Sequence, residues 1–114
     1  KKGGAEAMGK FDQFLAQNLS RFLQRMKETR EGEGDSSMLD RTLVLYGSSN
    51  SRTHQNVNYP LLLAGGKNFG LKHDQFLKFG NDVPMSNLFV SMMQSLGIEQ
   101  ESFVDSTGGL SGVA

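Results

Sequence analysis

The feature that most constrains this sequence is a run of five β-prone residues, Thr42 to Tyr46, that leads straight into a Gly-Ser-Ser-Asn corner. A second apolar run, Pro60 to Ala64, ends at a pair of glycines. A strand that is apolar on both faces is normally a central strand, covered from both sides. The two runs therefore predict the two main central strands of a small α/β sheet, at about 42–47 and 60–65.

Helical periodicity before the first run predicts a helix at about 10–29. Apolar residues recur there at three- and four-residue spacing and form one stripe: Phe11, Phe14, Leu15, Leu19, Phe22, Leu23 and Met26. Such a stripe is more often part of a core than a groove for a partner, and the sheet is its natural neighbour. Residues 1–9 are Gly-rich and lack this periodicity, so we expect them to be irregular.

A second helix is predicted at about 86–96. Ser86 is a residue type that caps helix N-termini, and an apolar stripe runs from Leu88 to Leu96. Gly97 suits the left-handed position that follows many helices. We expect the two helices to cover the two strands.

The remaining segments have weaker patterns. Residues 30–37 form an acidic, Gly-punctuated loop whose spacing does not match an EF-hand. Residues 69–79 suggest a ragged hairpin or a short strand. Residues 99–114 are expected to be a Gly- and Ser-rich tail with a mobile end.

Size and charge limit the possible partners. The 114 residues carry 12 Lys+Arg and 12 Asp+Glu, so no net charge attracts nucleic acid, and no cysteine is present for disulfides or thiolate metal sites. No apolar run reaches the roughly 18 residues needed to cross a membrane. Two strands covered on both faces need more neighbours than this chain supplies. We therefore expect residues 1–114 to be a single partial domain, the C-terminal portion of a larger one, or a module that completes its sheet by association. A compact two-layer α+β domain with further short strands is the alternative.

The corner after the first strand is the best candidate for a site, because open α/β sheets bind ligands at the carboxyl ends of their strands. Ser48, Ser49 and Asn50 hold that position, and His54 and Asn56 follow in the same loop. A Ser–His pair is conceivable there. No Gly-x-Ser-x-Gly elbow, orienting acid or oxyanion hole accompanies it. We expect these five residues to line a site and predict no catalytic residue among them.

Signals for metals and phosphates are weak. His54 and His73 are widely spaced and have no carboxylate set nearby. Gly65-Gly66-Lys67 lacks the Ser or Thr that follows lysine in a P-loop, so it is interpreted as a tight exit from a strand. The prediction is that the chain holds no metal and no cofactor.

The order of the elements resembles a known family. Leu39 to Ser48, His54 and Tyr59 to Gly66 resemble the C-terminal part of a bacterial family of uncharacterised secreted proteins with a His-x-x-Ser-His-His signature, described from planctomycetes. The upstream helix and the downstream Pro84–Phe89 continue the resemblance, which covers nearly all of the chain. That family is distantly similar to the alkaline phosphatase and sulfatase superfamily.

The resemblance implies a fragment of an alkaline-phosphatase-like fold from a secreted or periplasmic bacterial parent. In that superfamily the corresponding strand ends in Ser-Asp-His-Gly, whose Asp and His bind metal. Ser49 and Asn50 stand at those positions here, and Asn56 stands where the related family has a second histidine. The implied function is a fragment that is not catalytic by itself. Two alternatives are an assembly module that pairs strand edges, with another copy or with the N-terminal part of its parent, and a degenerate metal-dependent hydrolase of sulfate or phosphate esters.

Overall fold

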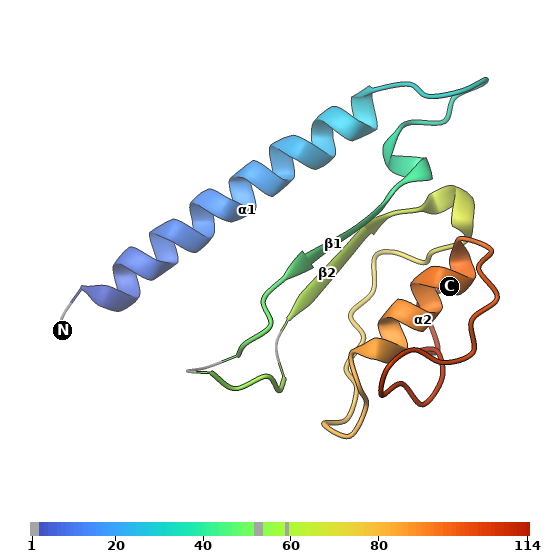
Figure 1. Ribbon diagram of the computed structural model, residues 1–114. Helices are drawn as coiled ribbons and strands as arrows, with labels where there is room; N and C mark the ends of the chain where they lie inside the picture. The colour runs from blue at the N-terminus through green and yellow to red at the C-terminus, as the bar shows by residue number, and fades with distance from the viewer. Residues whose placement is uncertain (1–2, 52–53, 59) are drawn as a thin grey trace. The chain divides into compact units, whose positions relative to one another are not determined.

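The computed structural model describes residues 3–51, 54–58 and 60–114. Its main elements are α1 (Gly4–Glu28), β1 (Leu43–Gly47), β2 (Leu61–Gly65) and α2 (Ser86–Ser95) (Figure 1). Single 3-10 turns lie at Leu39–Arg41 and Lys67–Phe69. Both predicted strands and both predicted helices are therefore confirmed, and the chain has the expected α/β character. It forms two compact units, residues 1–39 and residues 40–114.

Helix α1 begins earlier than its apolar stripe indicates. The expectation that residues before Lys10 are irregular is wrong, because helix runs from Gly4. The alanines, Glu6 and Met8 in this segment are good helix formers. Lys10 Nζ lies 2.8 Å from Glu6 Oε1, an ion pair one turn apart that supports the first turns.

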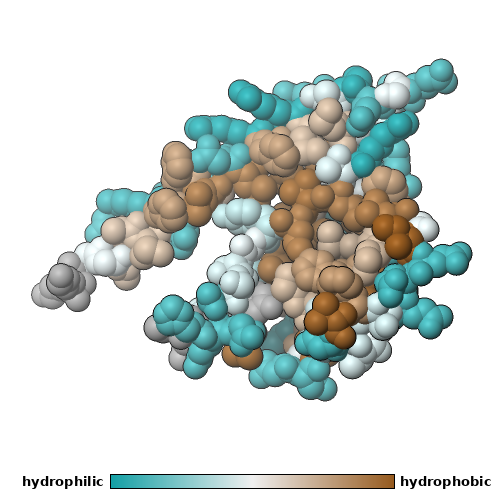
Figure 2. Space-filling view, viewed as in Figure 1, coloured by the Kyte–Doolittle hydropathy of each residue, from teal (hydrophilic) through white to brown (hydrophobic). Residues whose placement is uncertain are grey.

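The stripe of α1 is unevenly covered. Met26 is buried, whereas Phe11, Phe14 and Phe22 are about half exposed. Apolar side chains are visible along the helix in the hydropathy colouring of Figure 2. The stripe predicted as core is therefore core only at its C-terminal end.

The predicted loop after α1 is confirmed as a closed turn. Arg30 and Ser37 form an isolated antiparallel bridge. The backbone N–H of Glu31 donates to the Ser36 carbonyl at 3.2 Å, and the N–H of Met38 donates to the Thr29 carbonyl at 2.8 Å. The acidic segment is thus held by its own backbone.

Strands β1 and β2 pair antiparallel, with a register that runs from Leu43 opposite Gly65 to Gly47 opposite Leu61. Residues 48–60 therefore form the connection of a β-hairpin. In this arrangement the carboxyl ends of the two strands lie at opposite ends of the sheet. The edge where a parallel sheet gathers its site residues is not formed by these two strands.

The two faces of the hairpin have different surroundings. Because side chains alternate along a strand, Leu43, Leu45, Leu61 and Leu63 share one face. These four leucines pack against a core of Leu71, Leu88 and Val113. On the other face Tyr46 is 37% exposed and Leu62 is 44% exposed. The expectation that both faces are fully covered is wrong for this second face.

The segment after β2 contains no further strand. The expected hairpin or strand at 69–79 is absent among the described residues, where the chain is irregular from Leu71 to Gly80. Left-handed backbone at Gly66 and Gly70 turns the chain out of the strand direction. Leu71 nevertheless enters the core.

The last ten residues are an ordered part of the unit, and we call Asp105–Ala114 the strap. The expected mobile end is wrong, because Val113 is buried in the core. The N–H of Lys72 donates to the Val113 carbonyl at 3.0 Å, and Gln75 Nε2 donates to the Gly112 carbonyl at 2.5 Å. Apolar Leu110 and Val113 offset the entropy lost when this Gly-rich segment is ordered.

The two ends of α2 test the predicted caps. Gly97 has φ +77°, its N–H donates to the Gln94 carbonyl, and the N–H of Ile98 donates to the Met93 carbonyl, each at 3.0 Å. This is a Schellman motif and confirms the predicted C-terminal glycine. The predicted cap at Ser86 is wrong, because Met85 holds the N-cap position and makes no side-chain cap bond.

Candidate functional site

The predicted site residues all lie in the hairpin connection and are exposed to solvent. The hydroxyl of Ser48 accepts a hydrogen bond from the backbone N–H of Asn50 at 3.1 Å. The N–H of Ser51 donates to the Gln55 carbonyl at 2.8 Å. The hydroxyl of Ser48 therefore shapes the corner by binding its own backbone.

His54 is not joined to the serines. Its backbone is left-handed, with φ +55°, and its side chain is exposed. Among residues 3–51, 54–58 and 60–114 no hydrogen bond links its imidazole to Ser48 or Ser49, and Asn56 is exposed as well. Tyr59, which contributes to the family resemblance, lies outside the described residues. The sequence thus places five polar residues in one loop, and the structure shows no hydrogen bond between the side chains of these five residues.

No metal centre is found at this loop or elsewhere in the part of the chain that the structure describes. No three His, Cys, Asp or Glu side chains gather there closely enough to hold an ion. The second histidine is used differently, because His73 Nε2 lies 2.6 Å from the Gly65 carbonyl oxygen.

The Gly65-Gly66 turn is packed by apolar side chains. A Cβ added at Gly66 would overlap Leu43 Cδ2 and would lie 2.7 Å from Leu71 Cδ1. The Cβ side of Gly66 is therefore filled by the side chains of Leu43 and Leu71. This agrees with its interpretation as a strand exit.

A second polar region joins α2 to the strap, and the sequence patterns do not predict it. Ser86 Oγ donates to Asp105 Oδ1 at 2.7 Å. The Asn87 amide binds Thr107 twice: its Nδ2 donates to Thr107 Oγ1 at 3.0 Å, and its Oδ1 accepts the Thr107 N–H at 2.8 Å. We call these contacts, together with those of Ser91, the polar ladder.

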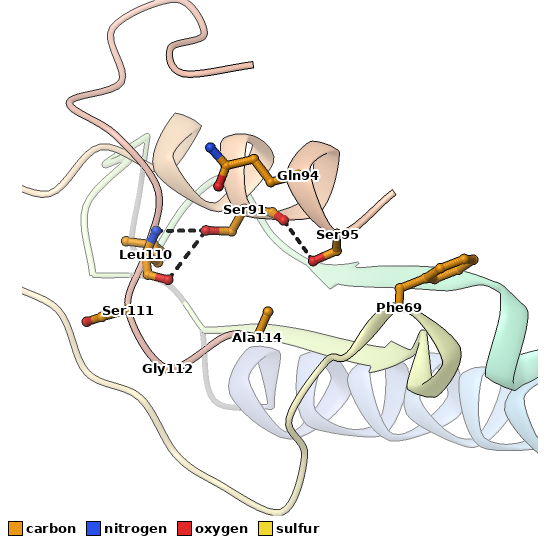
Figure 3. A pocket seen from close by; sticks show the side chains of 8 residues that line it. All are labelled: Phe69, Ser91, Gln94, Ser95, Leu110, Ser111, Gly112 and Ala114. Carbon is orange, nitrogen blue, oxygen red and sulfur yellow. Dashed lines mark hydrogen bonds between the residues drawn. The ribbon is translucent and has the colours of Figure 1, made fainter. Parts of the chain in front are cut away.

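Ser91 completes the polar ladder. Its Oγ accepts the Leu110 N–H at 2.7 Å and lies 3.4 Å from the Leu110 carbonyl oxygen (Figure 3). Ser86, Asn87 and Ser91 are all buried, with Asn87 only 5% exposed. No buried side-chain nitrogen or oxygen in the described part of the chain lacks a partner. The ladder therefore holds the strap without leaving an unsatisfied group.

A sequence signal for the ladder exists but is faint. Ser86, Asn87 and Ser91 are small polar residues within a predicted apolar helix, at spacings of one and four. On a helix these three positions lie on one side of the axis. Polar residues grouped in this way inside an apolar stretch indicate a buried polar contact, although they do not identify the partner.

A shallow hollow of about 430 Å³ lies beside the ladder, lined by Phe69, Ser91, Gln94, Ser95, Leu110, Ser111, Gly112 and Ala114 (Figure 3). No charged side chain lines it. Ser95 Oγ donates to the Ser91 carbonyl at 2.9 Å, and Gln94 Nε2 donates to the Gln100 carbonyl at 2.9 Å. Several of its polar groups are thus already used within the chain.

None of the helices in the described part of the chain combines the length and the apolar character that a membrane span requires. In comparisons with known proteins, no family model, no curated protein and no solved structure matches the chain.

Proposed function

We propose that the chain is a non-catalytic α/β module of an alkaline-phosphatase- or sulfatase-like protein, and that it works by adding its two strands to a larger sheet of that protein. The order of elements quoted from the sequence supports the family part of this proposal. Two features of the hairpin support the assembly part: the edges of β1 and β2 that pair with no third strand among the described residues, and the accessible second face with Tyr46 and Leu62.

The small size of the sheet argues that this face has a partner. A two-stranded hairpin is marginally stable by itself, and sheets usually gain further strands or a second cover. Neither β1 nor β2 pairs with a third strand among the described residues. The cross-strand pair Tyr46–Leu62 is exposed, and it lies between two strand edges that pair with no third strand among the described residues. Further strands and helices of an α/β domain would cover this pair and extend these edges.

The described residues of the hairpin connection, 48–51, 54–58 and 60, support the non-catalytic part. Ser48 binds backbone, and His54 is exposed without a hydrogen bond to a described serine. A nucleophile needs a base within hydrogen-bond reach and an orienting group. A degenerate ester hydrolase is the weaker candidate, because no group of three ligand side chains supports it in the described ranges.

Light scattering over a concentration series tests the proposal. Without a parent domain, the open face is expected to pair with a second copy, so the mass should rise above the 12.5 kDa of the monomer. Leu62→Lys should remove the part of the mass increase that comes from this face, by placing a charge on it. The matched control is Phe76→Lys, since Phe76 is 89% exposed and lies in an irregular segment.

Two outcomes would contradict the proposal that the hairpin face is an assembly surface. If the unmodified chain stays monomeric at high concentration, or if Phe76→Lys lowers the mass as much as Leu62→Lys does, the hairpin face is not an assembly surface.

A further inference from the structure

The side of α2 that carries the polar ladder binds the chain's own strap, an irregular segment that bends at Gly108 and turns at Ser111–Gly112. Ser91 binds both backbone groups of Leu110, and Asn87 binds the backbone N–H and the hydroxyl of Thr107. Leu110, in the middle of the strap, and Val113, near its end, also pack into the core. The same segment of a second copy offers identical groups to this surface.

The connection between α2 and the strap is strained at one residue. Val104 has φ +54° and is 86% exposed. A left-handed conformation is costly for a β-branched residue, and no burial of Val104 offsets the cost. The strain belongs to a tight turn in which the Ser106 N–H donates to the Phe103 carbonyl at 2.9 Å and Ser106 Oγ accepts the Phe103 N–H at 2.6 Å.

We propose that two copies of the chain exchange their straps, so that α2 of each copy binds Asp105–Ala114 of the other. Every contact of the polar ladder is retained in such a dimer, because the bound segment is identical. The turn at Val104 opens, which releases its strain. Short hinges under strain favour this kind of exchange.

The length of the hinge allows the exchange. Residues 96–104 connect the end of α2 to the strap, and the six residues that follow its C-terminal cap, 99–104, span about 20 Å when extended. The partner's strap completes a core that one copy without its own strap leaves open at Leu71 and Leu88. The inference depends on the strap contacts and is independent of whether the hairpin face joins a larger sheet.

Disulfide trapping between two different variants tests the exchange, since the chain has no cysteine of its own. A Cβ added at Gly109 would lie 3.0 Å from Ser91 Oγ. This separation suits the compact geometry of a disulfide between the two positions. Chains carrying Ser91→Cys and chains carrying Gly109→Cys are mixed at high concentration, warmed so that straps can open, cooled and oxidised. Linked species are then separated on a denaturing gel without reductant.

The exchange predicts that nearly all linked dimers join one Ser91→Cys chain to one Gly109→Cys chain. Random collision would instead give equal shares of the two homodimers and about half heterodimer. Mixing Ser91→Cys with Phe76→Cys, whose position is exposed and outside the strap, serves as the control for collision. A random distribution, or no linked dimer, overturns the proposal.

A second variant makes the test independent of the cysteines. Val104→Gly removes the strain of the closed turn, so it should lower the heterodimer yield several-fold when introduced into both chains. An unchanged yield would contradict the role of the hinge. Leu62→Lys separates this inference from the proposed function, because it should lower the mass caused by face pairing and leave the trapped heterodimer unchanged.

Discussion

The hairpin connection and the polar ladder contain similar side chains in opposite environments. Ser48 and Asn56 are exposed, and the bond that the Ser48 hydroxyl makes among the described residues is to local backbone. Asn87 and Ser91 are buried, and they bind groups 19 or 20 residues away. The comparison teaches that a hydroxyl or an amide acquires a structural role through burial and a distant partner. Residue type and clustering in sequence do not decide it.

Among the substitutions that test this comparison, the largest loss of stability is expected at Asn87. Asn87→Ala removes two hydrogen bonds to Thr107, one of them the acceptor of its N–H, and should lower the free energy of unfolding by about 2–3 kcal/mol. Urea denaturation followed by circular dichroism measures the change. The matched control is Asn56→Ala in the hairpin connection, which should change the value by less than about 0.5 kcal/mol. Equal losses at the two asparagines would break the comparison.

A smaller loss is expected at Ser91. Ser91→Ala removes the acceptor for the Leu110 N–H at 2.7 Å and should cost about 1–2 kcal/mol. Ser95→Ala is the control on the same helix, because the Ser95 hydroxyl donates only to the Ser91 carbonyl of its own helix. We expect Ser95→Ala to stay within about 0.5 kcal/mol of the unmodified chain. If the two variants are equally stable, Ser91 does not hold the strap.

Substitutions at the candidate site residues should have little effect on stability. Ser48→Ala and His54→Ala change exposed side chains, and we expect shifts of less than about 0.5 kcal/mol in the same urea experiment. A loss above about 1 kcal/mol for His54→Ala would reveal a partner for its imidazole. The hairpin connection would then again be a candidate for a functional site.

Metal addition should have the smallest effect. A metal that binds the folded chain at 100 times its dissociation constant would add about 2.7 kcal/mol and would raise the melting temperature by several degrees. We expect the melting temperature of the chain to be the same in millimolar zinc or calcium as in EDTA. A reproducible rise, together with turnover of an aryl sulfate or phosphate, would contradict the non-catalytic proposal.

The elements that could be predicted from the sequence are those that local sequence patterns determine. The apolar runs placed β1 and β2 to within a residue, and the stripe ending at Gly97 placed α2 together with its C-terminal cap. These features depend on neighbours within one or two turns. Side-chain periodicity and glycine conformation are enough to specify them.

The features that could not be predicted depend on distant contacts. The predicted site required the carboxyl ends of β1 and β2 to lie at the same edge of the sheet, and antiparallel pairing places them at opposite ends. An apolar run does not specify the direction of its strand relative to a neighbour. Ser86 has the residue type of a cap, but it donates to Asp105, which lies 19 residues further along. The strap looked like a mobile tail because its composition is Gly-rich, and two apolar residues at the right places were enough to order it.

Amide hydrogen exchange of the intact chain tests the central claim most directly. The N–H groups of Thr107 and Leu110 are held by Asn87 Oδ1 and Ser91 Oγ, so they should exchange at least about 100-fold more slowly than exposed N–H groups such as that of Asn56. Exchange at Thr107 and Leu110 that is as fast as at Asn56 would show that the strap is not held by the ladder, and it would contradict the account.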